Sequence, residues 1–206
     1  FTSQASARGK TTALINELID GQKVVQAYGN EEQSMERWYI ATMHSDGSPE
    51  TTERIRRHRQ QRQGKGFHTL EWSCGLPNRF PQWVEQHPEP ASVLLEDLGN
   101  LVANELFSPG RLPQSFEEEA ETVRKNLILP IRNVSEAGHR IVVVCDMMDE
   151  DSGIDTPEMK RFDRWMQSAQ QELAAEADGI VEVVAGFPNW IRKPTKGQER
   201  NQCSDH

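Results

Sequence analysis

Three consecutive residues near the start of the chain, Gly9, Lys10 and Thr11, could bind the phosphates of a nucleotide. A Gly-Lys-Thr triplet closes the phosphate-binding loop of many nucleotide-binding proteins, whose backbone N–H groups surround the phosphates. In that loop the lysine contacts the β- and γ-phosphates, and the hydroxyl group after it binds Mg²⁺. A helix that starts at Thr11 would direct its positive end toward the same phosphates. The alternative is a solvated lysine at a helix start.

The rest of this loop departs from the usual pattern, G-x-x-x-x-G-K followed by Thr or Ser. Gln4 stands where the first glycine is expected. Because glycine allows phosphate to approach the backbone closely, a side chain at this position can obstruct the ligand. We expect the nucleotide-binding loop to consist of Ser3, Gln4, Ala5, Ser6, Ala7, Arg8, Gly9, Lys10 and Thr11.

Two carboxylates follow a short apolar run and could hold Mg²⁺. The run at residues 93–95 predicts a buried strand, and Glu96 and Asp97 come directly after it. A carboxylate at the end of such a strand is a typical Mg²⁺ ligand in phosphate-loop proteins, acting through water. We therefore expect Thr11 and Glu96 to bind the metal. The alternative is that the two acids only begin a helix, whose positive end favours negative charge.

A predicted helix at residues 51–63 carries five arginines around a single histidine, His58. The arginines are Arg54, Arg56, Arg57, Arg59 and Arg62. Arg54 and Arg62 lie four positions before and after His58, so they share one helix face with it. A neutral imidazole can attack a phosphorus atom, and guanidinium groups stabilise the charge that develops. Repulsion from the arginines favours the neutral imidazole. The alternative is a solvated basic helix with an idle histidine.

The composition describes an acidic protein whose length of 206 residues fits a single domain. The formal net charge of −9 argues against nonspecific binding of nucleic acid. No apolar run approaches the roughly 18 residues that a membrane span needs. The three cysteines, Cys74, Cys145 and Cys203, are far apart and match no metal-binding spacing. We therefore expect free thiols in a reducing cytoplasm.

Strand-like and helix-like segments alternate along the chain. The expected strands are at residues 23–28, 37–43, 67–72, 92–97, 139–146 and 179–185. The expected helices are at 51–63, 98–107, 116–137 with a bend at Pro130, and 157–177, whereas 73–91 is expected to be a loop-rich crossing. This order predicts an α/β fold with a mostly parallel sheet flanked by helices. Because such sheets bind ligands at the carboxyl ends of their strands, the loop at residues 3–11 and the segments after Met43 and Leu95 should share one edge.

Several segments, in order and at similar spacing, resemble one protein family. They lie at residues 38–43, 53–62, 64–71, 93–96, 100–105, 171–174 and 181–188. The most specific part is the run R-I-x-x-H-R-x-x-R joined to G-K-G-F-x-T-x-E. On these motifs the chain resembles the bifunctional adenosylcobinamide kinase / adenosylcobinamide-phosphate guanylyltransferase family of cobalamin synthesis.

The resemblance implies a RecA-like P-loop fold over residues 1–193. The polar composition of residues 194–206 predicts a disordered tail. It implies a kinase that phosphorylates adenosylcobinamide with GTP or ATP and Mg²⁺. It also implies a transferase that moves GMP from GTP to adenosylcobinamide phosphate through a guanylylated histidine. Members of the family are similar in forming homotrimers.

Carried over residue by residue, the resemblance implies that the loop at 3–11 holds the nucleotide phosphates and that His58 lies in the nucleophile helix. It also implies that these residues complete the nucleotide site: Ala41, Thr42, Met43, Arg59, Arg62, Glu71 and Glu96.

One departure from the family bears on the transferase step. Some members carry two adjacent histidines in the helix, and the first of them takes GMP, but here that position is Arg57. A step of one position turns the side chain by about 100°. Two alternatives to the bifunctional enzyme follow. The chain could be a nucleotide-binding relative that has lost one or both activities, or a non-catalytic α/β protein whose basic helix contacts an acidic partner.

Overall fold

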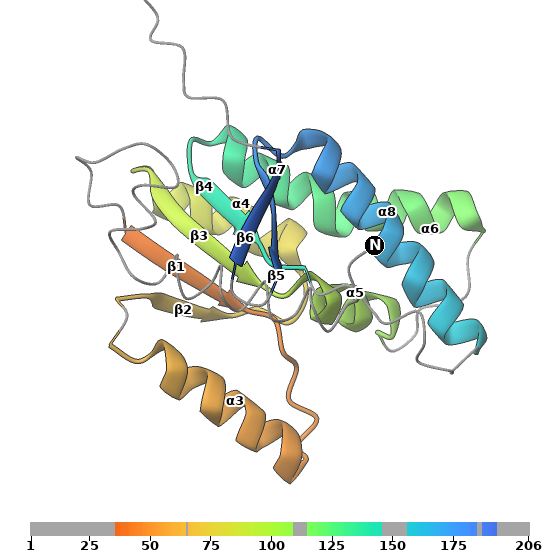
Figure 1. The fold of residues 1–206 in the computed structure, drawn as a ribbon, viewed down its shortest axis with the longest axis horizontal. Coiled ribbons are helices and arrows are strands. Elements are labelled where there is room, and N and C mark those ends of the chain that lie inside the picture. The colour runs from red at the N-terminus through yellow and green to blue at the C-terminus, as the bar shows by residue number, and fades with distance from the viewer. Residues whose placement is uncertain (1–35, 65, 109–114, 146–155, 185–186, 193–206) are drawn as a thin grey trace, which may run out of the picture.

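The computed structural model describes residues 36–64, 66–108, 115–145, 156–184 and 187–192 (Figure 1). The expected phosphate loop at residues 3–11, the expected strand at 23–28 and the tail from residue 194 lie outside this part of the chain. None of the helices in the described ranges is long and apolar enough to cross a membrane.

Four parallel strands form the central sheet, in the order β2-β1-β3-β4 (Figure 1). They are β1 (Glu36–Ala41), β2 (His68–Glu71), β3 (Ala91–Glu96) and β4 (Arg140–Val143). The register places Ala41, the last residue of β1, opposite both Glu71 and Glu96, which end the strands on either side. The carboxyl ends of three strands therefore meet at one edge, and the predicted α/β fold with a mostly parallel sheet is confirmed.

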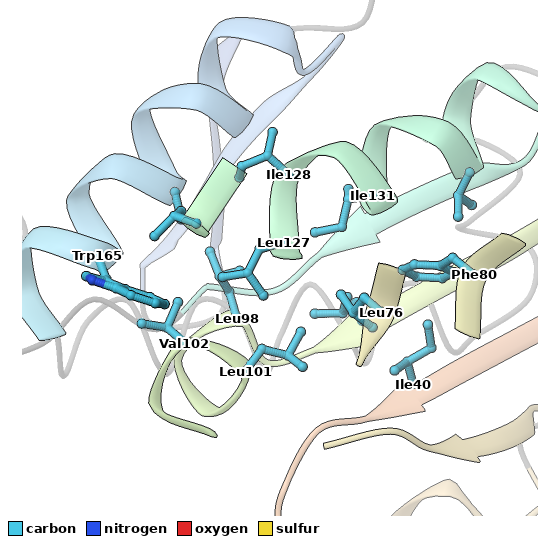
Figure 2. Close-up of a cluster of buried hydrophobic side chains, with 14 of the residues drawn as sticks. Ile40, Leu76, Phe80, Leu98, Leu101, Val102, Leu127, Ile128, Ile131 and Trp165 are labelled. Carbon is cyan, nitrogen blue, oxygen red and sulfur yellow. The ribbon is translucent and has the colours of Figure 1, made fainter. Parts of the chain in front are cut away.

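One face of the sheet packs against helices and forms the main hydrophobic core. Alternate strand residues point to this face, among them Ile40 and Leu95, which are completely buried. The helices that contribute to this core are α4 (Leu76–Gln86), α5 (Leu98–Leu106), α6 (Phe116–Val123), α7 (Leu129–Glu136) and α8 (Pro157–Glu176). Figure 2 shows Leu76 and Phe80 of α4 lying near Ile40 of the sheet. Burial of this apolar face fixes the position of the strand ends.

The opposite face of the sheet carries a smaller apolar cluster, and the last residue of the arginine-rich helix reaches it. Tyr39, Leu94 and Val144 are buried in this cluster, with Phe67 packed against it. Helix α3 (Pro49–Arg62) lies next to β2 (Figure 1), and its last residue, Arg62, covers the ring of Tyr39. The predicted helix at 51–63 is thus confirmed and lies beside the edge strand of the sheet.

Side-chain caps fix where the helices begin. The hydroxyl of Ser48 accepts a hydrogen bond from the backbone N–H of Thr51 at the start of α3. Asp97 caps α5 in the same way, and Ser115 forms a reciprocal capping box at α6. Each such cap stabilises its helix by about 1 kcal/mol. The cap of α5 sets the direction in which the chain leaves the end of β3.

Helix α4 corrects the expectation of a loop-rich crossing at residues 73–91. The prolines of this segment suggested a loop, but Pro77 lies in the first helical turn, where proline is tolerated. Pro81 lies inside the helix and removes one backbone hydrogen bond. Leu76, Phe80 and Trp83 are nevertheless spaced to share one buried face. Their burial outweighs the lost hydrogen bond.

The long helix expected at residues 116–137 is interrupted where the sequence predicts a bend. Helix α6 continues into a π-helical turn, η1 (Arg124–Ile128), and then into α7. Pro130 lies in the first turn of α7. Because proline lacks the N–H that would bond four residues back, a wider turn before it accommodates the ring.

The last strand expected from the sequence, at residues 179–185, is present but does not join the parallel sheet. β5 (Ile180–Val184) pairs antiparallel with β6 (Phe187–Arg192) in a separate two-stranded sheet. The sequence did not predict β6, because Pro188 argues against a strand interior. Arg192 donates from Nη1 to the carbonyl oxygens of Ala174 and Ala177, at 2.8 and 2.7 Å, and so joins this hairpin to the end of α8.

Candidate nucleotide site

Thr42 joins the ends of β1 and β3 at the carboxyl edge of the sheet. It is completely buried, and its backbone N–H donates to the carbonyl oxygen of Glu96 at 3.0 Å. Its hydroxyl lies 2.8 and 2.9 Å from the carbonyl oxygens of Glu96 and Asp97, and accepts a hydrogen bond from the Asp97 N–H at 2.6 Å. A hydroxyl has one hydrogen to donate and two lone pairs, so this geometry satisfies it fully. Thr42 therefore holds the backbone on which Glu96 is carried.

Glu96 and Asp97 have different roles in spite of their adjacency. The carboxylate of Asp97 accepts hydrogen bonds from the backbone N–H and side-chain amide of Asn100, at 2.7 and 3.0 Å. Asp97 therefore caps α5, which agrees with the alternative that these two acids begin a helix. Glu96 is half-buried as the last residue of β3. The described ranges contain no cluster of three or more side chains suited to a metal. Mg²⁺ bound to nucleotide phosphates needs only one or two carboxylates, which Glu96 fits.

The arginines of α3 differ in what they contact. Arg56 and Arg57 both bind the carboxylate of Glu53 on the exposed side of the helix. The hydrogen bonds from Arg56, and then those from Arg57, lower the pKa of Glu53 to about 2. These two arginines therefore belong to a surface ion-pair group on α3.

Arg59 reaches from α3 to the end of β2. Its Nε and Nη2 donate to the two carboxylate oxygens of Glu71, each at 2.8 Å. A planar guanidinium fits a carboxylate in this two-point manner, and the pair fixes the orientation of both groups. The pair links α3 to the strand end that lies beside Ala41 in the sheet.

Arg62 is buried, whereas the other arginines of α3 are exposed. The carbon of its guanidinium lies 4.2 Å from the centre of the Tyr39 ring, close enough for a cation–π interaction. Its Nε is buried and has no hydrogen-bond partner among the described residues. Burial lowers the pKa of Arg62, with an opposing effect from Glu71. The side chain thus presents a partly desolvated positive charge.

A cleft of about 760 Å³ lies between the second half of α3 and β2. Its lining residues are Arg56, Arg59, Gln60, Arg62, Gln63, Gly64, Gly66, Phe67, Thr69 and Glu71. Gly66 has a φ of +70°, and a Cβ placed there would lie 2.7 Å from Nη2 of Arg37. Glycine is favoured at this position because its backbone lies in the left-handed region, where other residues are strained, and any larger residue would also have to displace the Arg37 guanidinium.

The predicted site residues fall into two neighbouring groups. Arg59, Arg62 and Glu71 line the cleft. The other group lies at the carboxyl edge of β1 and β3 and consists of Ala41, Thr42, Met43 and Glu96. Glu71 belongs to both groups, since it also ends β2 beside Ala41. His58 is half-buried on α3 and is not among the residues that line the cleft.

Sequence reasoning did not identify the cleft residues Gln60, Gln63, Phe67 and Thr69. The alternation of residues 67–72 predicted a strand, and in an edge strand every second side chain points to the same face. Phe67, Thr69 and Glu71 share that spacing. This pattern could have placed Phe67 and Thr69 with Glu71 once Glu71 was considered a site residue.

The fold is that of a P-loop-type α/β protein, and its sheet edge and arginine-lined cleft suit a protein that binds a phosphorylated ligand. A model of the cobinamide kinase / cobinamide phosphate guanyltransferase family matches residues 23–191. The match covers most of the chain, and the chain therefore belongs to this family. This confirms the resemblance seen in the sequence motifs. No curated protein matches the chain.

Proposed function

We propose that the chain phosphorylates adenosylcobinamide and then transfers GMP from GTP to the adenosylcobinamide phosphate, in cobalamin synthesis. Membership of the family supports both activities. The structural observation that carries the proposal is the cleft lined by Arg59 and Arg62 in a protein whose net charge is −9. Guanidinium groups gathered in one cleft favour a ligand with several phosphate oxygens.

In the kinase step, the loop at residues 3–11 holds the triphosphate of GTP or ATP, with Lys10 at the β- and γ-phosphates. The hydroxyl oxygen of the aminopropanol group attacks the γ-phosphorus, the bond to the β–γ bridging oxygen breaks so that the nucleoside diphosphate leaves, and the hydroxyl proton passes to water. Mg²⁺, when bound, would neutralise charge on the phosphate oxygens. Thr11 and Glu96 would hold the ion, and Thr42 keeps Glu96 in place through its backbone hydrogen bonds.

In the transferase step, a ring nitrogen of His58 attacks the α-phosphorus of GTP and pyrophosphate leaves. An oxygen of adenosylcobinamide phosphate then attacks the same phosphorus, and the bond to the histidine breaks. Arg62 lies four positions after His58 and so shares its helix face, and Arg59 follows His58 directly in the chain; both would balance the charge of the phosphate. Glu71 orients Arg59 by its two hydrogen bonds. Ala41 and Met43 would line the nucleotide beside Thr42.

We also propose that the domain comprises residues 1–193, that the protein assembles as a homotrimer, and that it is located in the cytoplasm. The family resemblance supports the first two points, and the unpaired spacing of the cysteines supports the third. Sedimentation of the full chain tests the trimer. A measured mass equal to that of a single chain would count against it.

The test of the proposed function is covalent labelling with GTP that carries radioactive phosphorus in the α-position. Wild-type protein should retain acid-labile label through denaturation, and His58→Ala should retain none while still forming adenosylcobinamide phosphate. His44→Ala is the matched control, because His44 is exposed and lies outside α3.

Two other results would replace the proposal by one of its alternatives. Wild-type protein that binds GTP but takes no label would be a relative without transferase activity. Protein that binds no GTP or ATP would favour an interaction protein whose basic helix contacts an acidic partner.

A further inference from the structure

The segment at residues 100–105 matches the family motifs but has no role in the function proposed above. In α5 it contains Asn104 and Glu105, which face the loops at the carboxyl edge of the sheet. Leu101, Val102 and Leu106 of the same helix are buried in the core. This packing holds α5 rigidly against the sheet, so polar groups on its adjacent face have fixed positions.

The side-chain amide of Asn104 bonds two strand-end segments at once. Its Nδ2 donates to the carbonyl oxygen of Thr42 at 3.0 Å and to that of Ser73 at 2.8 Å. Thr42 follows β1, and Ser73 follows β2 by two residues. An amide nitrogen carries two hydrogens, so it can satisfy both carbonyl groups together.

Glu105, the next residue, also connects α5 to the loop after β2. It is buried, and its carboxylate accepts hydrogen bonds from the backbone N–H of Gly75 at 3.2 Å and from the side-chain amide of Asn126 at 3.0 Å. The loop between β2 and α4 is therefore held at Ser73 and again at Gly75 by consecutive residues of α5.

We propose that Asn104 is a positioning residue that fixes the segment after β1 relative to the segment after β2 at the nucleotide edge. The proposal rests on the proposed function for its kinetic consequence, because Thr42 lies in the first segment and Glu71 directly precedes the second. Asn104 itself lies 62 positions from Thr42 and 31 from Ser73 along the chain, so the connection exists only in the folded protein.

Asn104→Asp tests this role because it keeps the shape of the side chain and removes both N–H donors. A carboxylate would face two carbonyl oxygens, so both connections would be lost. Hydrogen–deuterium exchange of the full chain should become about ten-fold faster in peptides covering residues 41–44 and 72–76. Asn104→Ala removes the donors without adding charge, and it replaces Asn104→Asp in the exchange experiment if that variant does not fold.

Ser115→Ala is the matched control. It removes the capping box of α6, an exposed cap whose hydrogen bonds join Ser115 and Glu118. The control should leave exchange in the two peptides unchanged. Equal exchange in Asn104→Asp, Ser115→Ala and wild type would overturn the proposal, and so would acceleration of both peptides in the control.

Kinetics separate positioning from general destabilisation. Asn104→Asp should raise the KM for nucleotide about ten-fold and change kcat less, because the site is misplaced in protein that is still folded. A lower kcat with unchanged KM would indicate only less folded enzyme and would contradict the role. If wild-type protein binds no nucleotide but the exchange changes occur, the proposed function fails and the structural role of Asn104 stands.

Discussion

Arg59 of α3 and Glu71 of β2, which both line the cleft, form a two-point ion pair with two hydrogen bonds of 2.8 Å each. The two side chains are 58% and 53% exposed, and exposed pairs of this kind add little to folding stability. The pair therefore serves to orient Arg59 rather than to hold the fold. Two neighbouring arginines of the same helix, Arg56 and Arg57, bind Glu53 instead and give an internal comparison.

Arg59→Lys keeps the charge but loses the planar, two-point geometry. We expect the affinity for GTP to fall about ten-fold, while the free energy of unfolding changes by less than about 1 kcal/mol. Calorimetry and thermal unfolding measure the two quantities. Arg57→Lys is the matched control, since Arg57 does not line the cleft. Equal losses of affinity in both variants would show that only net charge matters.

Arg62 should contribute to ligand binding more than to stability. Its Nε lacks a hydrogen-bond partner in the described residues, and its burial carries a desolvation cost. Arg62→Met keeps a long apolar side chain over Tyr39 but loses the cation–π interaction. We expect the unfolding free energy to stay within about 1 kcal/mol of wild type and GTP affinity to fall at least about ten-fold.

Arg54→Met is the control for this variant, because Arg54 is exposed and does not line the cleft. A large drop in the melting temperature of Arg62→Met with unchanged GTP affinity would reverse the assignment and make Arg62 a structural residue.

The four strands of the parallel sheet could be predicted from the sequence because burial imposes a simple pattern on them. β3 is a continuous apolar run that ends in carboxylates, and this pattern is enough to place Glu96 at the edge of the sheet. Helix α4 could not be recognised in the same way. Its prolines dominated the local pattern, whereas the packing of Phe80 and Trp83 against the core decides the conformation.

The contacts within the candidate site were less predictable, because they join residues that are distant in the chain. Arg59 and Glu71 are 12 positions apart, on a helix and a strand whose relative placement no local pattern gives. Motif matching suggested both residues but not their pairing. The residues that Asn104 contacts lie still farther away in the sequence, and these contacts depend on how α5 packs.

Glu96→Gln should lower kcat more than it lowers the affinity for nucleotide. The amide keeps the shape of the side chain but is a poor ligand for Mg²⁺, so kcat should fall at least about ten-fold while nucleotide affinity changes little. Steady-state kinetics over a range of Mg²⁺ concentrations measure both. Glu89→Gln is the control, as Glu89 is exposed and precedes β3 at the opposite edge. Wild-type rates for Glu96→Gln at saturating Mg²⁺ would remove Glu96 from the metal site.

His139 lies just before β4, at the sheet edge opposite the nucleotide site, and should make stability depend on pH. It is buried beside Trp83, and its Nδ1 accepts a hydrogen bond from the backbone N–H of Ala91 at 3.2 Å. The ring is therefore neutral at that nitrogen. Burial lowers the pKa of His139 below its ordinary value of 6.5, and repulsion from His87 lowers it further.

Because the unfolded chain binds this proton more readily, the stability that neutral His139 contributes is complete above pH 6.5 and is lost as the pH falls toward the folded-state pKa. Protonation also puts a hydrogen on Nδ1 and breaks the bond to Ala91. We expect the melting temperature of wild type to fall between about pH 7 and about pH 5.5, and His139→Asn, which cannot titrate, to fall less. His44→Asn, at an exposed position, should keep the wild-type slope. Parallel curves for wild type and His139→Asn, measured by thermal unfolding, would show that His139 does not couple protonation to folding.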